Sequence, residues 1–205
     1  LKCYECEHVF TELVLSDDAA QKFFCTNENL SSIYTDENII DNRIKQIYKP
    51  KLDYVIKTYF EVKGKYPQSI LDVGAGGGHF VQLAKKAGLK SSGIEINQQS
   101  IDFSKRTFDI DLINIDFAKK FNNIKKYDII TFWGVIEYLN NPNYFIKNAQ
   151  KIVAENNGMI FSEVPRYDSV STTIQKIYKN SSVRHFTPWC RQSCLLQQYI
   201  PFGQA

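Results

Sequence analysis

Residues 69–80 read SILDVGAGGGHF, from Ser69 to Phe80, and this stretch decides the fold of the chain. The apolar run at 70–73 predicts a buried strand. The glycines at 74, 76 and 78 let the backbone turn tightly and approach a ligand where a Cβ would clash. Apolar residues at 80, 83, 84 and 87 then have helical spacing, and Gly88 is placed to end that helix. The loop therefore joins a strand to a helix N-terminus, with backbone N–H groups expected to point at a ligand.

The spacing of the glycines separates several classes of cofactor site. A Walker A loop needs Gly-Lys-Ser/Thr, which is missing here, and His79 stands where a dinucleotide fingerprint has its third glycine. The stretch from Asp72 to Gly78 reads D-x-G-x-G-x-G. It resembles motif I of the class I S-adenosylmethionine-dependent methyltransferases, and the likeness covers roughly residues 40–165, most of an ordinary domain. The resemblance implies cofactor contacts by the following residues: Asp72, Gly74, Ala75, Gly76 and Gly78. The alternative is a structural turn in another kind of α/β protein.

Two further strands are predicted to end in acidic residues. Glu95 lies in the strand 92–97, and an acid about 20 residues after a glycine turn can accept both ribose hydroxyls. The strand 112–117 carries Asp116. In the resembled family this acid accepts from the adenine amino group, while Ile96 and Phe117 would sandwich the ring. The alternatives are a surface acid for Glu95 and a helix N-cap for Asp116.

The fourth predicted strand and its exit loop cover residues 127–139. Its continuous apolar run is typical of a parallel strand covered on both faces. Trp133, Gly134, Glu137 and Tyr138 resemble motif IV of small-molecule methyltransferases, except that Glu-Tyr replaces the usual Glu-His. A base is needed when a hydroxyl or carbon acid is methylated, and the candidates are Glu137, Tyr138 and His185. The alternative for His185 is a loop histidine without a catalytic part.

Helical patterns separate the five predicted strands. These strands lie at 70–73, 92–97, 112–117, within 127–139, and at 159–164. This series predicts an α/β fold with a doubly wound, mostly parallel sheet, as in the Rossmann-like class I methyltransferases. Residues 44–205 form the predicted S-adenosylmethionine-binding domain. Residues 1–43 form a short N-terminal extension, with a linker or lid over 26–43. The chain stops about where the resembled fold begins its last hairpin, so either an incomplete hairpin or a tail that is not native is expected.

The composition limits the classes of partner that the chain is expected to bind. The chain has 205 residues, 43% hydrophobic and 23% charged, with a net charge of +3 carried by scattered basic residues. These favour a solvated surface over a nucleic-acid groove, and the Asp/Asn-Pro-Pro-aromatic signature of nucleic-acid methyltransferases is missing. The longest apolar run, at 129–136, is too short to span a bilayer, and we expect no signal peptide. The sequence therefore predicts a cytoplasmic protein without nucleic-acid or membrane partners.

A C-x-x-C pair, Cys3 and Cys6, opens the chain. It has the spacing of one zinc knuckle, which supplies two of the four ligands of a tetrahedral site. The pair resembles the second half of the zinc ribbon that precedes some methyltransferases, including sugar C-methyltransferases. The first half would then lie upstream of Leu1. The alternative is a pair of ordinary reduced thiols.

Together these features predict methyl transfer from S-adenosylmethionine to a small-molecule acceptor, for example a sugar nucleotide, with S-adenosylhomocysteine as the product. Methyl transfer from a sulfonium is an in-line displacement that depends mainly on alignment of the reactants and exclusion of water. Two alternatives stay open. One is a nicotinamide-dependent oxidoreductase, and the other is a catalytically silent S-adenosylmethionine-binding or zinc-scaffold module.

Overall fold

A four-stranded parallel sheet forms the centre of the molecule. The computed structural model describes residues 4–5, 16–26, 35–36, 39–117, 124–153 and 158–164. The strands run in the order β2-β1-β3-β4 and cover Ser69–Val73 (β1), Lys90–Ile94 (β2), Ile129–Trp133 (β3) and Met159–Glu163 (β4). Because all pairs are parallel, the carboxyl ends of the strands lie along one edge. The order places the switch of direction between β1 and β3, where ligands bind in open α/β sheets.

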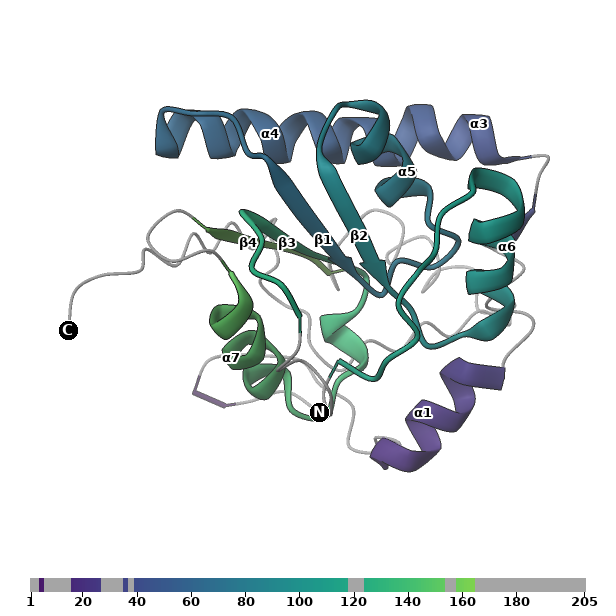
Figure 1. The fold of residues 1–205 in the computed structure, drawn as a ribbon. Helices are drawn as coiled ribbons and strands as arrows, with labels where there is room; N and C mark the ends of the chain where they lie inside the picture. The colour runs from purple at the N-terminus through teal and green to yellow at the C-terminus, as the bar shows by residue number, and fades with distance from the viewer. Residues whose placement is uncertain are drawn as a thin grey trace.

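Helices cover both faces of this sheet, as Figure 1 shows. Helices α4 (Lys49–Lys63) and α5 (His79–Lys86) lie on one face, and α7 (Pro142–Ile152) lies on the other. Side chains alternate along β1, so Ile70 packs in the core under α4 and α5, whereas Leu71 and Val73 pack on the side of α7. Helix α6 (Gln98–Phe108) follows β2. The doubly wound α/β fold predicted from the sequence is confirmed.

A helical segment before β1 begins inside the stretch 26–43, which the sequence analysis assigns to a linker or lid. Helix α3 (Ile40–Arg43) leads through a π-helical turn, Ile44–Tyr48, directly into α4. In that turn the backbone N–H of Lys49 donates to Ile44 O, five residues back. Pro50, which lacks an N–H, sits in the first turn of α4 just after this wider turn. Residues 40–43, predicted as the end of a linker, are therefore helical.

The third predicted strand, residues 112–117, is wrong. Only Ile113 pairs with the sheet, through a single parallel bridge to Ile94. Ile113 donates to Gly93 O at 2.8 Å and accepts from Glu95 N at 3.1 Å. The N–H of Ile115 then turns back to Ile113 O at 3.1 Å, which removes that donor from a sheet ladder. The segment thus continues past the end of β2 as a loop that still brings Asp116 to the carboxyl edge.

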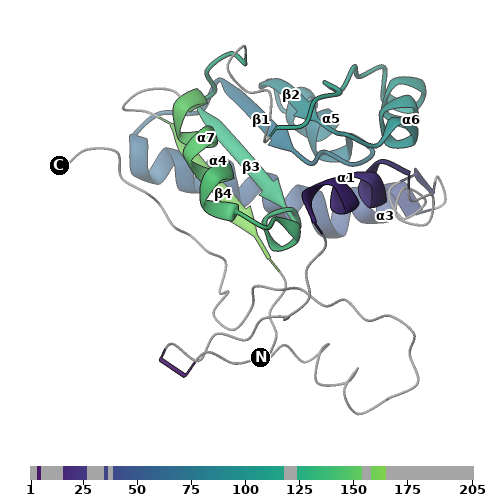
Figure 2. The same cartoon turned by 90° about the horizontal axis from the view of Figure 1, so that it is seen from below.

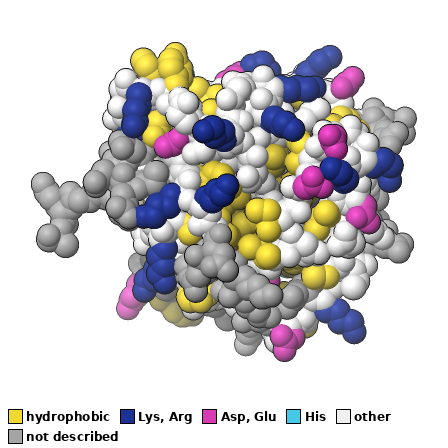
Figure 3. Space-filling view, in the orientation of Figure 1, with side chains coloured by type: hydrophobic (Ala, Val, Ile, Leu, Met, Phe, Trp, Pro, Cys, Tyr) yellow, Lys and Arg dark blue, Asp and Glu magenta, His cyan; other side chains and the backbone are white. Residues whose placement is uncertain are grey.

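The surface is mixed in charge. Figure 3 shows basic and acidic side chains interspersed over the face seen in Figure 1. Across the described parts of the chain, no helix is both long enough and apolar enough to cross a bilayer.

Candidate functional site

A cavity of about 680 Å³ opens at the carboxyl edge of the sheet. Its walls come from the glycine loop after β1, the loops after β2 and β3, the start of α7 and the N-terminal helix α1, Asp17–Thr26. Figure 2 shows α1 lying at the same end of the sheet as the carboxyl ends of β1 and β3. Both the position and the size suit a small-molecule ligand site.

Most of the site residues predicted from the sequence line this one cavity. Those that line it are Asp72, Gly74, Ala75, Gly76, Glu95, Ile96, Asp116, Phe117, Trp133, Gly134 and Tyr138. Gly78 and Glu137 are buried and do not line it. Cys3, Cys6 and His185 lie outside the described residues. Within the described ranges, no group of three or more side chains of metal-binding type is found.

Four backbone amides of the glycine loop donate hydrogen bonds within the protein, whereas the sequence analysis expects such groups to point at a ligand. Gly74 N and Ala75 N both donate to Ile94 O at 2.9 Å, and Gly78 N donates to Ala75 O at 3.0 Å. Gly76 N donates to Glu95 Oε2 at 2.7 Å. These donors are already satisfied, so what this loop offers a ligand is close approach of the backbone, without side chains in the way.

Glu95 is the organising acid of the site. Besides Gly76 N, its carboxylate accepts the N–H groups of Ile96 at 2.8 Å and Asn97 at 2.9 Å, both at Oε1. An ionised carboxylate has about four acceptor positions, so about one remains unused, and Glu95 lines the cavity. In this conformation the Glu95 carboxylate has room for about one further hydrogen bond, whereas the sequence analysis expects it to accept from two ribose hydroxyls.

Helix α1 covers one side of the cavity and was missed by the sequence analysis. Its Ala20 and Phe24 line the cavity, and the Phe24 ring meets the Tyr138 ring edge-on at 5.2 Å between centroids. Asn97, which follows β2, bonds to the C-terminal end of α1: its Nδ2 donates to Phe24 O at 3.0 Å and to Cys25 O at 3.3 Å. The same side chain caps α6 through Oδ1, which accepts from Ser100 N at 3.0 Å. Only the cap was predictable from sequence.

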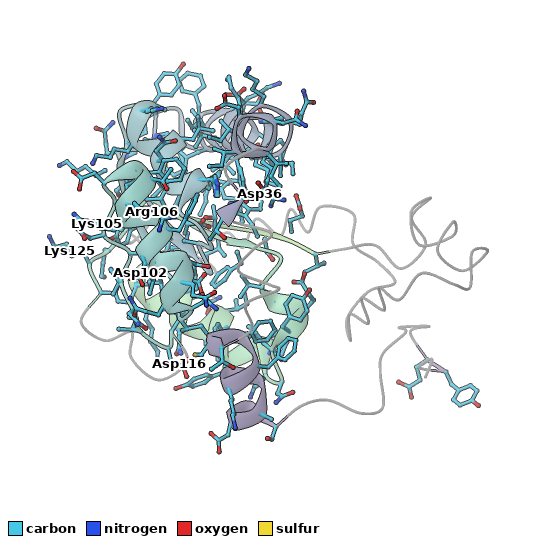
Figure 4. The ribbon with its side chains drawn as sticks, turned by 90° about the vertical axis from the view of Figure 1, so that its right-hand side faces the viewer. Asp36, Asp102, Lys105, Arg106, Asp116 and Lys125 are labelled. Carbon is cyan, nitrogen blue, oxygen red and sulfur yellow. The ribbon has the colours of Figure 1, made fainter. Side chains whose placement is uncertain are left out.

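Asp116 lies close to this covering helix. Figure 4 shows Asp116 beside α1, well away from the outward-facing Asp102 and Lys105 of α6. Burial raises the pKa of the Cys25 thiol, and the negative charges of Glu95 and Asp116 raise it further. Glu95, Asp116 and the C-terminal part of α1 therefore enclose the same end of the cavity.

Asp72 is a buried acid on the cavity wall. Burial raises the pKa of its carboxyl to about 7, and the charge of Glu95 acts in the same direction. The hydrogen bond from Thr131 Oγ1, at 2.7 Å, and the charge of Lys51 oppose that rise. Asp72 therefore changes its charge near neutral pH, so the potential of the cavity depends on pH.

Because the pKa of Asp72 is raised on folding, its contribution to stability is lost as pH rises from about 4 to about 7. Over that range the unfolded chain ionises this carboxyl while the folded chain keeps it protonated. Asp72→Asn cannot ionise, so its stability relative to the parent should grow by about 2 kcal/mol between pH 5 and pH 8. Urea unfolding of the ligand-free proteins measures this difference. Asp53→Asn, at an exposed position paired with Lys49, is the control and should show no such growth. A constant difference for Asp72→Asn would contradict the expectation.

Glu137 is buried beneath the cavity, with 1% of its surface exposed. Burial raises the pKa of its carboxyl to about 7, and Glu163 adds to the rise while Lys51 opposes it. Oε1 lies near Gly134, where an added Cβ would be 3.5 Å away. Oε2 has no hydrogen-bond partner among the described residues. The carboxyl therefore lies next to Gly134, which lines the cavity, although Glu137 itself does not line it.

His79 is a structural residue at the start of α5. Its ring stacks on Tyr48 at 5.4 Å and contacts Phe103 and Phe108. Burial, together with the positive charge of Arg43, lowers the pKa of His79 to about 4. The imidazole is therefore neutral at physiological pH and supports the wall that carries Tyr48.

The chain is similar in sequence and in fold to known methyltransferases. A ubiquinone biosynthesis O-methyltransferase of Coxiella burnetii is 28% identical over 116 residues, which are 54% of this chain and 48% of that protein. The chain thus spans about half the length of this relative. The plantazolicin methyltransferase BpumL, solved with S-adenosylhomocysteine, superposes with a TM-score of 0.61 at 20% identity, over 77% of this chain and 61% of that one.

A second solved structure is matched over a larger share of its own length. The magnesium protoporphyrin IX methyltransferase of Synechocystis PCC 6803 has a TM-score of 0.61 at 14% identity, and the match covers 87% of this chain and 84% of that one. These likenesses establish the Rossmann-like fold of the class I methyltransferases. The family described as methyltransferase domain matches residues 44–198, and the chain belongs to that family.

Proposed function

We propose that the chain binds S-adenosylmethionine in the cavity at the carboxyl edge and transfers its methyl group to a small-molecule acceptor. The observation that carries the proposal is the meeting of Gly76, Glu95 and Asp116 around one cavity, although they follow one another along the chain in three separate loops. This arrangement supports a bare backbone surface, an acceptor for a ribose hydroxyl and an acceptor for the adenine amino group in one site.

The residues present fit the chemistry of this ligand. An added Cβ at Gly74 would collide with the Val135 side chain, so the loop has no room for a larger residue beside the cavity. Ile96 and Phe117 offer apolar walls for a purine. Asp72 and Glu95 add negative charge, which favours a cationic sulfonium. The wall therefore combines features that suit both ends of the ligand.

When bound, S-adenosylmethionine supplies a methyl group on a positively charged sulfur that leaves as a neutral thioether. The chain has to align the acceptor, exclude water and accept a proton where the acceptor is a hydroxyl. Tyr138 lines the cavity, and Glu137 lies beneath it with a pKa of about 7. We propose both, with His185, as the candidates for orienting the acceptor or holding its proton.

The acceptor class comes from analogy and stays part of the proposal. The similar proteins are named for ubiquinone biosynthesis, plantazolicin and magnesium protoporphyrin IX. Their names support methyl transfer to small molecules or peptides without choosing one acceptor. We also propose residues 44–205 as the catalytic domain, with the extension 1–43 contributing α1 to the cavity wall.

Calorimetry with three ligands tests the proposed cofactor. S-adenosylmethionine and S-adenosylhomocysteine should both bind with one site per chain, whereas NAD should give no heat of binding at the same concentrations. Release of S-adenosylhomocysteine with a panel of phenols, amines and sugar nucleotides then tests turnover. Binding of NAD alone would support an oxidoreductase, and cofactor binding without turnover of any acceptor would support a silent binding module.

A further inference from the structure

A polar strip interrupts the apolar face of the sheet under α4. Asp72 pairs in register with Thr131, and Trp133 pairs with Glu163. Side chains alternate along a strand, and Ile70, Ile129 and Phe161 of the same strands pack in the core on the α4 side. The polar residues, two or four positions further along each strand, therefore face α4 at the carboxyl edge, next to the cavity.

Lys51 of α4 reaches into this strip. Its Nζ lies 2.8 Å from Glu163 Oε1 and 4.9 Å from the centroid of the Trp133 ring. The Lys51 side chain is 17% exposed. An ammonium held on a carboxylate and over an indole face, with little contact to water, is both well positioned and weakly screened. The indole beneath it lines the cavity.

The charge of Lys51 acts on two buried carboxyls. It opposes the rise in the pKa of Asp72 and also that of Glu137. The groups that act in the other direction are Glu95 on Asp72 and Glu163 on Glu137, while Thr131 donates to Asp72. Lys51 is thus the cation common to both acids, although it is separated from both along the sequence.

We propose that Lys51 is a positioning residue of the methyl-transfer site, held by Glu163 over the Trp133 indole so that its ammonium supplies the positive charge beside the buried acids Asp72 and Glu137. This inference rests on the proposed function, since it makes one lysine responsible for the charge state of Asp72 and Glu137 at the proposed methyl-transfer site. Without that ammonium, Asp72 and Glu137 stay protonated, and therefore neutral, up to a higher pH. A cationic ligand is then bound less tightly beside them.

The same helix provides a matched control. Lys49 forms an ion pair with Asp53 at 2.6 Å, but its side chain is 58% exposed. Lys49→Met and Lys51→Met therefore remove the same charge from positions two residues apart. An exposed pair contributes little to stability and is screened by water, so only the Lys51 variant should change the site.

Tryptophan fluorescence gives a readout that does not depend on methyl transfer. The chain has two tryptophans, and Trp189→Phe leaves Trp133 as the remaining one. Indole emission responds to nearby charge, so a titration of the ligand-free protein from pH 5 to pH 9 should show a transition near pH 7. We expect this midpoint to come from Asp72 and Glu137, whose pKa values are both raised to about 7, so Asp72→Asn with Glu137→Gln should remove it.

In this background Lys51→Met should raise the midpoint by about one pH unit, because the charged form of each acid loses its cation. Lys49→Met should leave the midpoint unchanged, and Lys51→Arg should restore it. If Lys51→Met does not fold, Lys51→Gln and the Lys51→Arg comparison provide the same test. An unchanged midpoint in a folded Lys51 variant that lacks the charge would overturn the proposal.

Calorimetry with S-adenosylmethionine separates this inference from the proposed function. The pH below which affinity falls should rise in Lys51→Met in parallel with the fluorescence midpoint, with no change in Lys49→Met. A fluorescence shift in a chain that binds no S-adenosylmethionine would refute the proposed function and leave the electrostatic role of Lys51 standing. Normal binding with an identical pH profile in Lys51→Met would refute the role in the site.

Discussion

Replacing Glu95 with alanine is expected to weaken S-adenosylhomocysteine binding about 100-fold, because a hydrogen bond to a charged acceptor contributes about 1.5–3 kcal/mol. We expect the unused acceptor position of this carboxylate to take a ribose hydroxyl, since Glu95 lines the cavity. The substitution also frees the N–H groups of Gly76, Ile96 and Asn97, whose bonds to Glu95 are 2.7–2.9 Å long. Loss of both the acceptor and the loop geometry should therefore appear in the dissociation constant measured by calorimetry.

Two comparisons make this result specific to the site. Asp102→Ala removes an acid from the exposed side of α6, where its partner is Gln98, and should leave the dissociation constant unchanged. Thermal unfolding of Glu95→Ala without ligand should show a folded protein with a modest loss of stability, since water can reach the freed amides. An affinity within threefold of the parent would remove Glu95 from the cofactor site.

Gly78→Ala is expected to cost about 3–4 kcal/mol of folding free energy, which is a large part of the stability of a domain this size. Gly78 has a φ of +78°, a left-handed conformation that costs an L-residue about 1–2 kcal/mol. An added Cβ would also collide with the Ser104 Oγ of α6. Overpacking of this kind typically costs about 1–3 kcal/mol more. Urea unfolding measures the sum.

Gly64→Ala separates the two contributions. Gly64 ends α4 with a φ of +68°, but an added Cβ there has nothing within 4 Å. This variant should lose only the cost of the backbone conformation, about 1 kcal/mol. If Gly64→Ala and Gly78→Ala destabilise the protein equally, the contact between the glycine loop and α6 is not a source of stability.

The structural features that the sequence predicts well are those that depend on residues close together along the chain. The strand, the glycine loop and α5 follow from a local run of apolar residues and glycines, and Glu95 follows from its distance to that loop. The strand predicted at 112–117 is wrong because hydrophobic alternation does not reveal that Ile115 turns back on Ile113. Only the paired backbone partners decide between a strand and a loop there.

The rest of the site depends on contacts between distant segments. Helix α1 reaches the cavity through Asn97, more than 70 residues along the chain, and its own sequence gives no sign of that partner. The pairing of Lys51 with Glu163 joins the helix before β1 to the end of β4. Such pairs arise from the packing of α4 on the sheet, so they are visible only once the fold is known.

Asn97 uses two different atoms for its two tasks, and this division has a consequence for how a substrate enters. The carbonyl oxygen stays with the first turn of α6, whereas the amide nitrogen alone holds the carbonyls of α1. Swinging the covering helix outward therefore breaks bonds at the nitrogen and leaves the oxygen in place. We expect a ligand to be exchanged in this way, with the two bonds to α1 and the Phe24–Tyr138 ring contact broken while the cap on α6 stays in place.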